Sequence, residues 1–312
     1  MTTTVYFATN RTVNGPPDQV SSYTNQSTAS DRPQDITYGT AFVETDPRSD
    51  GTGTITLLKD LQQGGFVQSI IDDIEADSRN VLVFIHGFAN GFDDALIRAA
   101  FNREWLFEGG ADLAVIAFSW PSLGEVIVPG FPPDAYLKDQ AMAAQSGPHI
   151  RAFLSNLEPI FKKVQARGRR TLLLAHSMGN LALQAAVESW FTVGNGDADL
   201  FHEALLAAAD EVDSSFADPA KRLGGLRRLA RRVSVYYSHG DLVLSVLSAG
   251  INHNRRLGQD GPAHRTDPNR FPSGVYRMVD CSGADNSGGF QQSHQYYRKS
   301  KQVRADLVSV MV

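Results

Sequence analysis

The sequence predicts an α/β fold in which helices cover both faces of a mostly parallel sheet with an antiparallel N-terminal edge. From Asn80 onward, apolar runs of strand length alternate with longer amphipathic segments, as βαβ units require. Because these runs are apolar throughout, they fit strands that are buried on both faces. Two β-rich runs before Asn80 are separated by a turn cluster, which predicts an antiparallel pair.

The elements are expected in the following order. A strand-like run at 5–11 precedes 12–36, which is rich in polar residues and proline and is predicted to be a polar loop. The antiparallel pair is expected at 38–46 and 53–60. The apolar runs predict strands at 81–87, 113–120, 171–177, 203–210, 233–240 and 275–282. The helices are expected at 93–108, 138–166, 179–193, 216–230 and 296–308.

The domain organisation is predicted to be simple. The chain has 312 residues, of which 42% are hydrophobic, and it shows neither an internal repeat nor a linker, so 1–312 is expected to form one domain. The proline-rich and apolar segment 121–137 should lie above the carboxyl edge of the sheet. It is interpreted either as a small cap over a binding pocket or as a packed surface loop.

Composition argues against several classes of partner. The net charge of −5 gives no electrostatic reason to expect nucleic acid or an anionic membrane. No basic leader and no apolar run of membrane-spanning length is present, so we expect no membrane span and a cytoplasmic location. The one cysteine, Cys281, lies in an apolar run and is expected to be a buried thiol. The histidines are dispersed, and we expect neither a metal site nor another cofactor.

A serine followed two residues later by glycine occurs six times, at Ser49, Ser122, Ser177, Ser238, Ser248 and Ser287. Ser177 alone lies between a buried strand pattern and a helix pattern and has small residues on both sides, Ala175 and Gly179. A strained turn that presents a nucleophilic serine requires such neighbours, because the strand and the helix approach closely there. The alternative is a serine that caps the helix.

A serine nucleophile needs backbone donors that stabilise the developing oxyanion. Where a serine nucleophile stands at such a strand-to-helix turn, these donors come from the loop after the first long strand and from the residue after the serine. The N–H groups of Phe88 and Met178 are therefore the candidates. His86 is expected to brace the first loop, and the pocket candidates are His86, Trp120, Leu123 and His239.

The serine also needs a base and an acid that orients the base. With the order serine, acid, histidine, three of the eight histidines are excluded because they precede the serine: His86, His149 and His176. His294 alone follows the last predicted strand and immediately precedes the terminal helix, so it is the predicted base. The predicted acid is Asp241, near the end of the preceding strand. Asp210 and Asp213 are the alternatives, and the competing role for each of these carboxylates is to cap a helix.

The conjunction of motifs resembles a bacterial α/β-hydrolase family long catalogued as a domain of unknown function. The resemblance rests on VFIHGFANGFDDAL, FSWPSLG, LLLAHSMGN, LLAAADEVD, YYSHGDLVLSV and the closing SHQYY, and covers roughly residues 80–310. It implies the α/β-hydrolase fold and a triad of Ser177, Asp241 and His294. It implies little about the substrate, because one scaffold hosts many functions.

These observations predict a serine hydrolase that cleaves a carboxylic ester through an acyl-enzyme. The expected partner is a small-molecule ester with an apolar or aromatic acyl group, suited to the apolar segment 121–137. An amidase, a thioesterase or an acyltransferase would use the same triad. A non-catalytic binding protein on a hydrolase scaffold is the alternative from another class.

Overall fold

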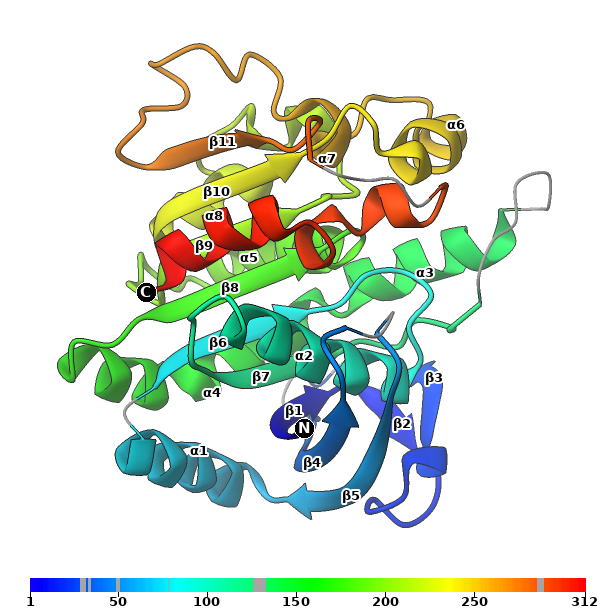
Figure 1. Ribbon diagram of the computed structural model, residues 1–312, viewed down its shortest axis with the longest axis vertical. Coiled ribbons are helices and arrows are strands. Elements are labelled where there is room, and N and C mark those ends of the chain that lie inside the picture. Colours follow the sequence, from blue (N-terminus) through cyan, green and yellow to red (C-terminus); the bar gives the residue numbers. More distant parts are fainter. Residues whose placement is uncertain (29–31, 33–34, 49–50, 78, 126–132, 285–288) are drawn as a thin grey trace.

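A nine-stranded sheet runs through the centre of the protein in the order β11-β10-β9-β8-β6-β7-β1-β4-β5 (Figure 1). The structure is a computed structural model that describes the chain except residues 29–31, 33–34, 49–50, 78, 126–132 and 285–288. The strands are β1 (Thr2–Thr9), β4 (Thr37–Thr45), β5 (Gly53–Leu61), β6 (Asn80–Ile85), β7 (Leu113–Ser119), β8 (Thr171–His176), β9 (Phe201–Ala207), β10 (Ala230–Tyr237) and β11 (Tyr276–Asp280).

The directions of the strands confirm the predicted fold class. All neighbours from β11 to β1 are parallel, whereas β4 is antiparallel to both β1 and β5. The N-terminal strand β1 lies between β7 and β4 and so joins the parallel strands to the antiparallel edge. The carboxyl ends of β6 and β8 to β11 meet at one edge, where ligands of α/β proteins bind.

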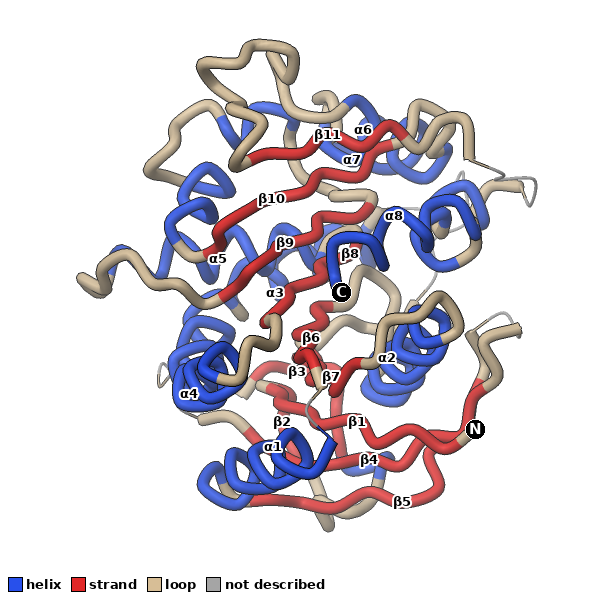
Figure 2. The backbone as a smooth tube through the Cα atoms, turned by 60° about the vertical axis from the view of Figure 1, so that its left-hand side comes forward, coloured by secondary structure: helices blue, strands red, loops and turns tan. Residues whose placement is uncertain are grey.

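Helices cover both faces of the sheet (Figure 2). One face carries α1 (Gln63–Asp77), α4 (Gly147–Ala166) and α5 (Gly179–Thr192), and the other carries α2 (Phe92–Phe107) and α8 (Lys301–Met311). The remaining helices are α3 (Asp134–Gln145), α6 (Ala249–Asn252) and α7 (Leu257–Asp260). None of the helices in the described ranges is long and apolar enough to cross a membrane.

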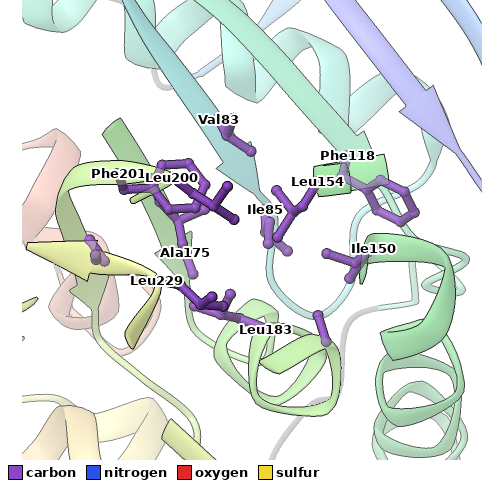
Figure 3. Packing of buried hydrophobic residues seen from close by; sticks show 14 of the residues in the cluster. Val83, Ile85, Phe118, Ile150, Leu154, Ala175, Leu183, Leu200, Phe201 and Leu229 are labelled. Atoms are coloured by element: carbon purple, nitrogen blue, oxygen red, sulfur yellow. The ribbon is translucent and has the colours of Figure 1, made fainter. Parts of the chain in front are cut away.

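The core consists of two apolar layers, one on each face of the sheet. Side chains alternate along each strand, so Val83 and Ile85 of β6 face one layer while Leu82 and Phe84 face the other. Figure 3 shows the first layer, in which Val83 and Ile85 lie near Leu154 of α4. Both faces are buried, which explains why the strands are apolar throughout.

The segment 12–36 differs from the predicted polar loop. Strand β2 (Arg11–Val13) pairs with β3 (Tyr23–Ser27) to form a small antiparallel sheet. Tyr23 is buried, and its ring stacks on that of Phe92 with 3.8 Å between the ring centroids. This aromatic contact attaches the otherwise polar segment to α2, and no local sequence pattern reveals it.

Two predicted helices are interrupted or replaced. The helix expected at 138–166 is divided into α3 and α4 near Ser146, because Pro148 has no N–H with which to continue the helical hydrogen bonds. The segment 216–230 forms 3-10 helices at Asp213–Phe216 and Arg222–Arg228, followed by the start of β10. Gly224 and Gly225, which have low α-helix propensity, lie inside the second of these 3-10 helices.

The last helix and the first helix also differ from the prediction. The last α-helix begins at Lys301, later than expected, because the Ser300 side chain accepts a hydrogen bond from the Val303 N–H and caps it. The sequence prediction omits α1 altogether. Its buried residues Phe66, Ile70 and Ile74 are spaced four apart, a signal that would have revealed an amphipathic helix.

Candidate active site

Ser177 lies in the sharp turn between β8 and α5. Its backbone φ is 53°, in the left-handed region that side chains rarely adopt. Two hydrogen bonds hold this conformation: the Ser177 N–H donates to the Ala207 carbonyl at 3.0 Å, and the Asp210 N–H donates to the Ser177 carbonyl at 3.1 Å. The neighbouring strand β9 and the loop after it therefore stabilise the turn, at a strain typical of functional sites.

Glycines allow the backbone to approach this turn closely. A Cβ atom on Gly179 would lie 2.4 Å from the His86 carbonyl oxygen, and one on Gly87 would lie 2.8 Å from Cβ of Ser177. Both distances are shorter than real contacts, so neither position accepts a side chain without a shift. Gly179, two positions after the serine, is therefore small because the loop that follows β6 passes close to it.

His294 and Asp241 are in direct contact. The imidazole Nδ1 of His294 lies 2.7 Å from Oδ2 of Asp241, and both side chains are buried. The other carboxylate oxygen, Oδ1, accepts the Leu244 N–H at 3.0 Å. The second ring nitrogen of His294, Nε2, has no hydrogen-bond partner among the described residues. The imidazole is therefore oriented from one side and free to accept a proton on the other.

The loops that carry these two residues are joined to each other. His294 ends a 3-10 helix at Gln292–His294, after β11, and Asp241 follows β10. The Ser293 hydroxyl accepts the Leu242 N–H at 3.0 Å and donates to the Phe290 carbonyl at 2.6 Å. This bridge fixes the position of the histidine loop relative to the aspartate.

The protonation of the two neighbouring histidines is shifted in opposite directions. Burial lowers the pKa of His294, but the charge of Asp241 and the hydrogen bond to it outweigh burial, so the pKa is raised above its ordinary value. Burial, followed by the charge of His294, lowers the pKa of His176 well below its ordinary value. The His176 ring lies 4.9 Å from that of His294 and 4.5 Å from that of Tyr297. His176 is thus a neutral packing partner.

Among the described residues, neither of the two alternative acids is hydrogen-bonded to His294. Asp210 accepts a hydrogen bond from the Tyr136 hydroxyl at 2.7 Å, contacts the Ser248 hydroxyl, and forms a buried ion pair with Arg256 at 2.8 Å. Asp213 begins the 3-10 helix at Asp213–Phe216, and among the described residues its carboxylate has no hydrogen-bonding or ionic partner. Of the three candidate carboxylates, Asp241 is the one in contact with the histidine.

The predicted oxyanion donors lie beside the serine. Phe88 follows β6 and lines the same cavity as Ser177, and Met178 immediately precedes α5. Among the residues that the structure describes, neither backbone N–H has a hydrogen-bond acceptor. Both amides are therefore available to a ligand atom. Met178 also lies at the start of a helix, where backbone donors favour negative charge.

His86 contacts the loops that follow β6 and β7. Its ring stacks on Trp120 with 4.9 Å between centroids, and the Trp120 indole N–H donates to the His86 carbonyl at 2.7 Å. Its ring nitrogens lie 2.9 Å from the Gly87 carbonyl and 3.1 Å from that of Trp120. Burial, followed by the charge of Arg11, lowers its pKa to about 3, so it is neutral at physiological pH.

A cavity of about 290 Å³ opens beside the serine and the histidine. Among the described residues, its lining contains Ser177, His294, Gly87, Phe88, Tyr136, Asp210, Val243, Phe290, Arg98, Arg298 and Lys299. This lining is more polar and more basic than a pocket suited to the apolar acyl group that the sequence predicts. Its cations come from α2 and from the segment before α8.

None of the four predicted pocket residues lines this cavity. His86 and Trp120 are buried against each other, and the backbone N–H of Leu123 is bound to Asp139 at 2.9 Å. His239 is half-exposed and lies 3.3 Å from Asp260. Proximity to the sheet edge does not determine where these side chains point. Of the cap expected at 121–137, residues 126–132 lie outside the described residues.

Arg11 is a residue of the site region that sequence reasoning missed. It is fully buried, and its guanidinium donates to the carbonyls of Trp120 at 2.7 Å and Asn90 at 2.9 Å. Further bonds reach Ser122 and Asn25. Arg11 thus joins β2 and β3 to the loops after β6 and β7. An arginine at the end of a strand-like run gives no sign of this role.

Two chemical alternatives find no support in the described ranges. No group of three or more His, Cys, Asp or Glu side chains is arranged to hold a metal ion there. Cys281 is buried, and burial raises the pKa of its thiol to about 12, so it is a poor nucleophile at neutral pH.

Comparison with known proteins agrees with this architecture. The model of a family described as alpha/beta hydrolase of unknown function (DUF900) matches residues 63–310. A search of curated proteins finds no match. The matched range contains Ser177, Asp241 and His294 and leaves out β1 to β5.

Proposed function

Because the chain belongs to this family of α/β hydrolases, we propose that it is a serine hydrolase that cleaves carboxylic esters. The observation that carries the proposal is the 2.7 Å contact between His294 and Asp241, in a histidine that lines the same cavity as Ser177 and whose Nε2 has no partner among the described residues. A base that is oriented on one side and open on the other is what a serine nucleophile requires.

The first half of the reaction forms an acyl-enzyme. Nε2 of His294 takes the hydroxyl proton of Ser177 as Oγ bonds to the ester carbonyl carbon, and the carbonyl oxygen gains the negative charge. The N–H groups of Phe88 and Met178 stabilise this oxyanion. The tetrahedral intermediate then collapses, the bond to the alcohol breaks, and the imidazolium gives its proton to the leaving alkoxide. Asp241 stabilises the imidazolium throughout.

Water completes the second half. His294 takes a proton from a water molecule, the resulting hydroxide attacks the acyl carbon, and a second tetrahedral intermediate releases the carboxylic acid and the Ser177 hydroxyl. Esters are proposed ahead of amides because an alkoxide leaves more readily than an amine. The step needs no electron transfer, and the side chains present supply every proton acceptor and donor.

The test is covalent labelling with a fluorophosphonate, followed by peptide mapping. We expect an adduct on Ser177 in the folded protein and its loss in Ser177→Ala. Ser238 is a matched control, because it is also buried and also followed two residues later by glycine. Labelling should persist in Ser238→Ala. Absence of an adduct at Ser177 under native conditions would remove the serine-hydrolase proposal.

The reaction class is tested separately with 4-nitrophenyl esters of increasing acyl length beside a 4-nitroanilide. The cavity volume of about 290 Å³ favours short acyl groups. We expect turnover to be fastest with short esters and much slower with the anilide. An anilide cleaved faster than the ester of the same acid would make the protein an amidase instead.

A further inference from the structure

The charge in the cavity is unevenly distributed. Arg98, Arg298 and Lys299 contribute cationic side chains to the lining. Asp210, the acidic side chain in the lining, is already engaged by the buried guanidinium of Arg256 at 2.8 Å and by the Tyr136 hydroxyl at 2.7 Å. The negative charge of Asp210 is thus compensated within the protein, and among the three cations Arg98 is the one on which the inference rests.

Arg98 has few partners for its donors. Its Nε is buried and has no hydrogen-bond partner among the described residues, and Nη1 lies 3.5 Å from Oε1 of Gln295, at the long limit of a hydrogen bond. Within the described part of the chain no carboxylate lies within 4.0 Å of this guanidinium. A guanidinium has five N–H donors, and leaving buried donors unsatisfied costs free energy.

Arg98 is also close to the reacting groups. It extends from α2 into the cavity lined by Ser177 and His294. Its charge lowers the pKa of His176, after the larger effects of burial and of His294. Gln295, the residue after His294, contacts Arg98 and also accepts the Nε–H of Arg298 at 2.7 Å. A ligand at Ser177 therefore lies within reach of this charge.

We propose that the substrate is a carboxylate-bearing ester, whose carboxylate binds the Arg98 guanidinium while Ser177 attacks its ester carbonyl. The inference rests on the proposed function and replaces the apolar acyl group expected from the sequence. A carboxylate supplies the acceptors that Arg98 lacks, and the planar guanidinium matches its two oxygens. Arg98 and Ser177 line one cavity of about 290 Å³, so the carboxylate and the ester are expected in one small molecule.

The experiment compares pairs of esters that differ only in charge. Mono-4-nitrophenyl adipate is measured beside its neutral methyl ester, which places the carboxylate on the acyl side. In the second pair, 4-acetoxybenzoate is measured beside methyl 4-acetoxybenzoate, with the carboxylate on the leaving group. We expect kcat/KM to favour the anionic member of at least one pair, and the preference to fall as NaCl is raised. These measurements on the unaltered protein need no variant.

The residue is tested with Arg98→Gln. The ratio of kcat/KM for the anionic ester to that for its neutral match should fall about 10- to 100-fold, the effect of losing a charged hydrogen bond. Arg270→Gln is the matched control: Arg270 lies outside the cavity, its removal changes the net charge equally, and the ratio should not change.

The outcomes separate the two proposals. Cleavage of neutral esters at Ser177 without preference for either anionic ester, or a ratio unchanged in Arg98→Gln, would overturn the carboxylate inference and leave the serine hydrolase standing. No cleavage of any of the four esters, together with no fluorophosphonate adduct on Ser177, would overturn both.

Discussion

Asp210 and Asp241 are two buried carboxylates that follow neighbouring parallel strands, but they have different partners. Asp210, after β9, binds Arg256, Tyr136 and Ser248, whereas Asp241, after β10, binds His294 and the Leu244 N–H. Asp210 satisfies a permanent cation, while Asp241 faces a base whose charge changes with protonation. The same residue type at the same sheet edge therefore binds a guanidinium in one case and an imidazole in the other.

The largest effect on activity is expected from Asp241→Asn. The amide cannot stabilise the imidazolium of His294 and favours the wrong tautomer, so kcat on an activated ester should fall about 10,000-fold, worth about 5 kcal/mol of activation free energy. Steady-state kinetics on a short 4-nitrophenyl ester measures it. Near-native turnover in this variant would show that Asp241 is not the acid.

The corresponding substitution at Asp210 should chiefly affect stability. Asp210→Asn leaves the buried Arg256 without its counter-charge, which should lower the free energy of unfolding by about 3–5 kcal/mol. Urea titration measures this loss. Asp213→Asn is the matched control, expected to change stability by less than about 0.5 kcal/mol because its carboxylate has no partner in the described part of the chain. A more severe loss of kcat in Asp210→Asn than in Asp241→Asn would reverse the two assignments.

The smallest expected effect is a shift of the pH profile. His294 must be neutral to accept a proton, and its pKa is raised, so kcat/KM should increase with pH and level off only above the ordinary histidine pKa. Asp241→Asn removes the interactions that raise this pKa, so the acid limb should move to lower pH. Asp210→Asn should move it in the same direction by less, because the effect of Asp210 on His294 is smaller. Equal shifts in the two variants would contradict the expectation that Asp241 raises the pKa of His294 more than Asp210 does.

The sequence predicts that the candidate residues follow different strands of one parallel sheet, and the structure places them there for a physical reason. Parallel strands bring their carboxyl ends to one edge, so residues after β8, β10 and β11 meet there even though Ser177 and His294 are far apart in the chain. Chain order leaves the acid open among Asp210, Asp213 and Asp241. The contact with His294 depends on loop conformation, which no periodic pattern in the sequence encodes.

Side-chain direction is the part that the sequence does not predict. Trp120 and His86 lie near the sheet edge but pack against each other, and Arg98 reaches the cavity from the middle of α2. Which side of a helix faces a cavity depends on how the helix packs on the sheet. The basic character of the cavity therefore became evident only in three dimensions.

The burial of Arg11 has a consequence for where the functional unit begins. The family match starts at residue 63, yet β1 pairs with β7, and Arg11 holds the carbonyls of Trp120 and Asn90 from a segment outside that match. A fragment trimmed to the matched residues would expose a flank of β7 and release the loop that carries the Phe88 amide. Strand β1 and Arg11 thus support β7 and the loops around the candidate site, and circular dichroism of such a fragment should show loss of ordered structure.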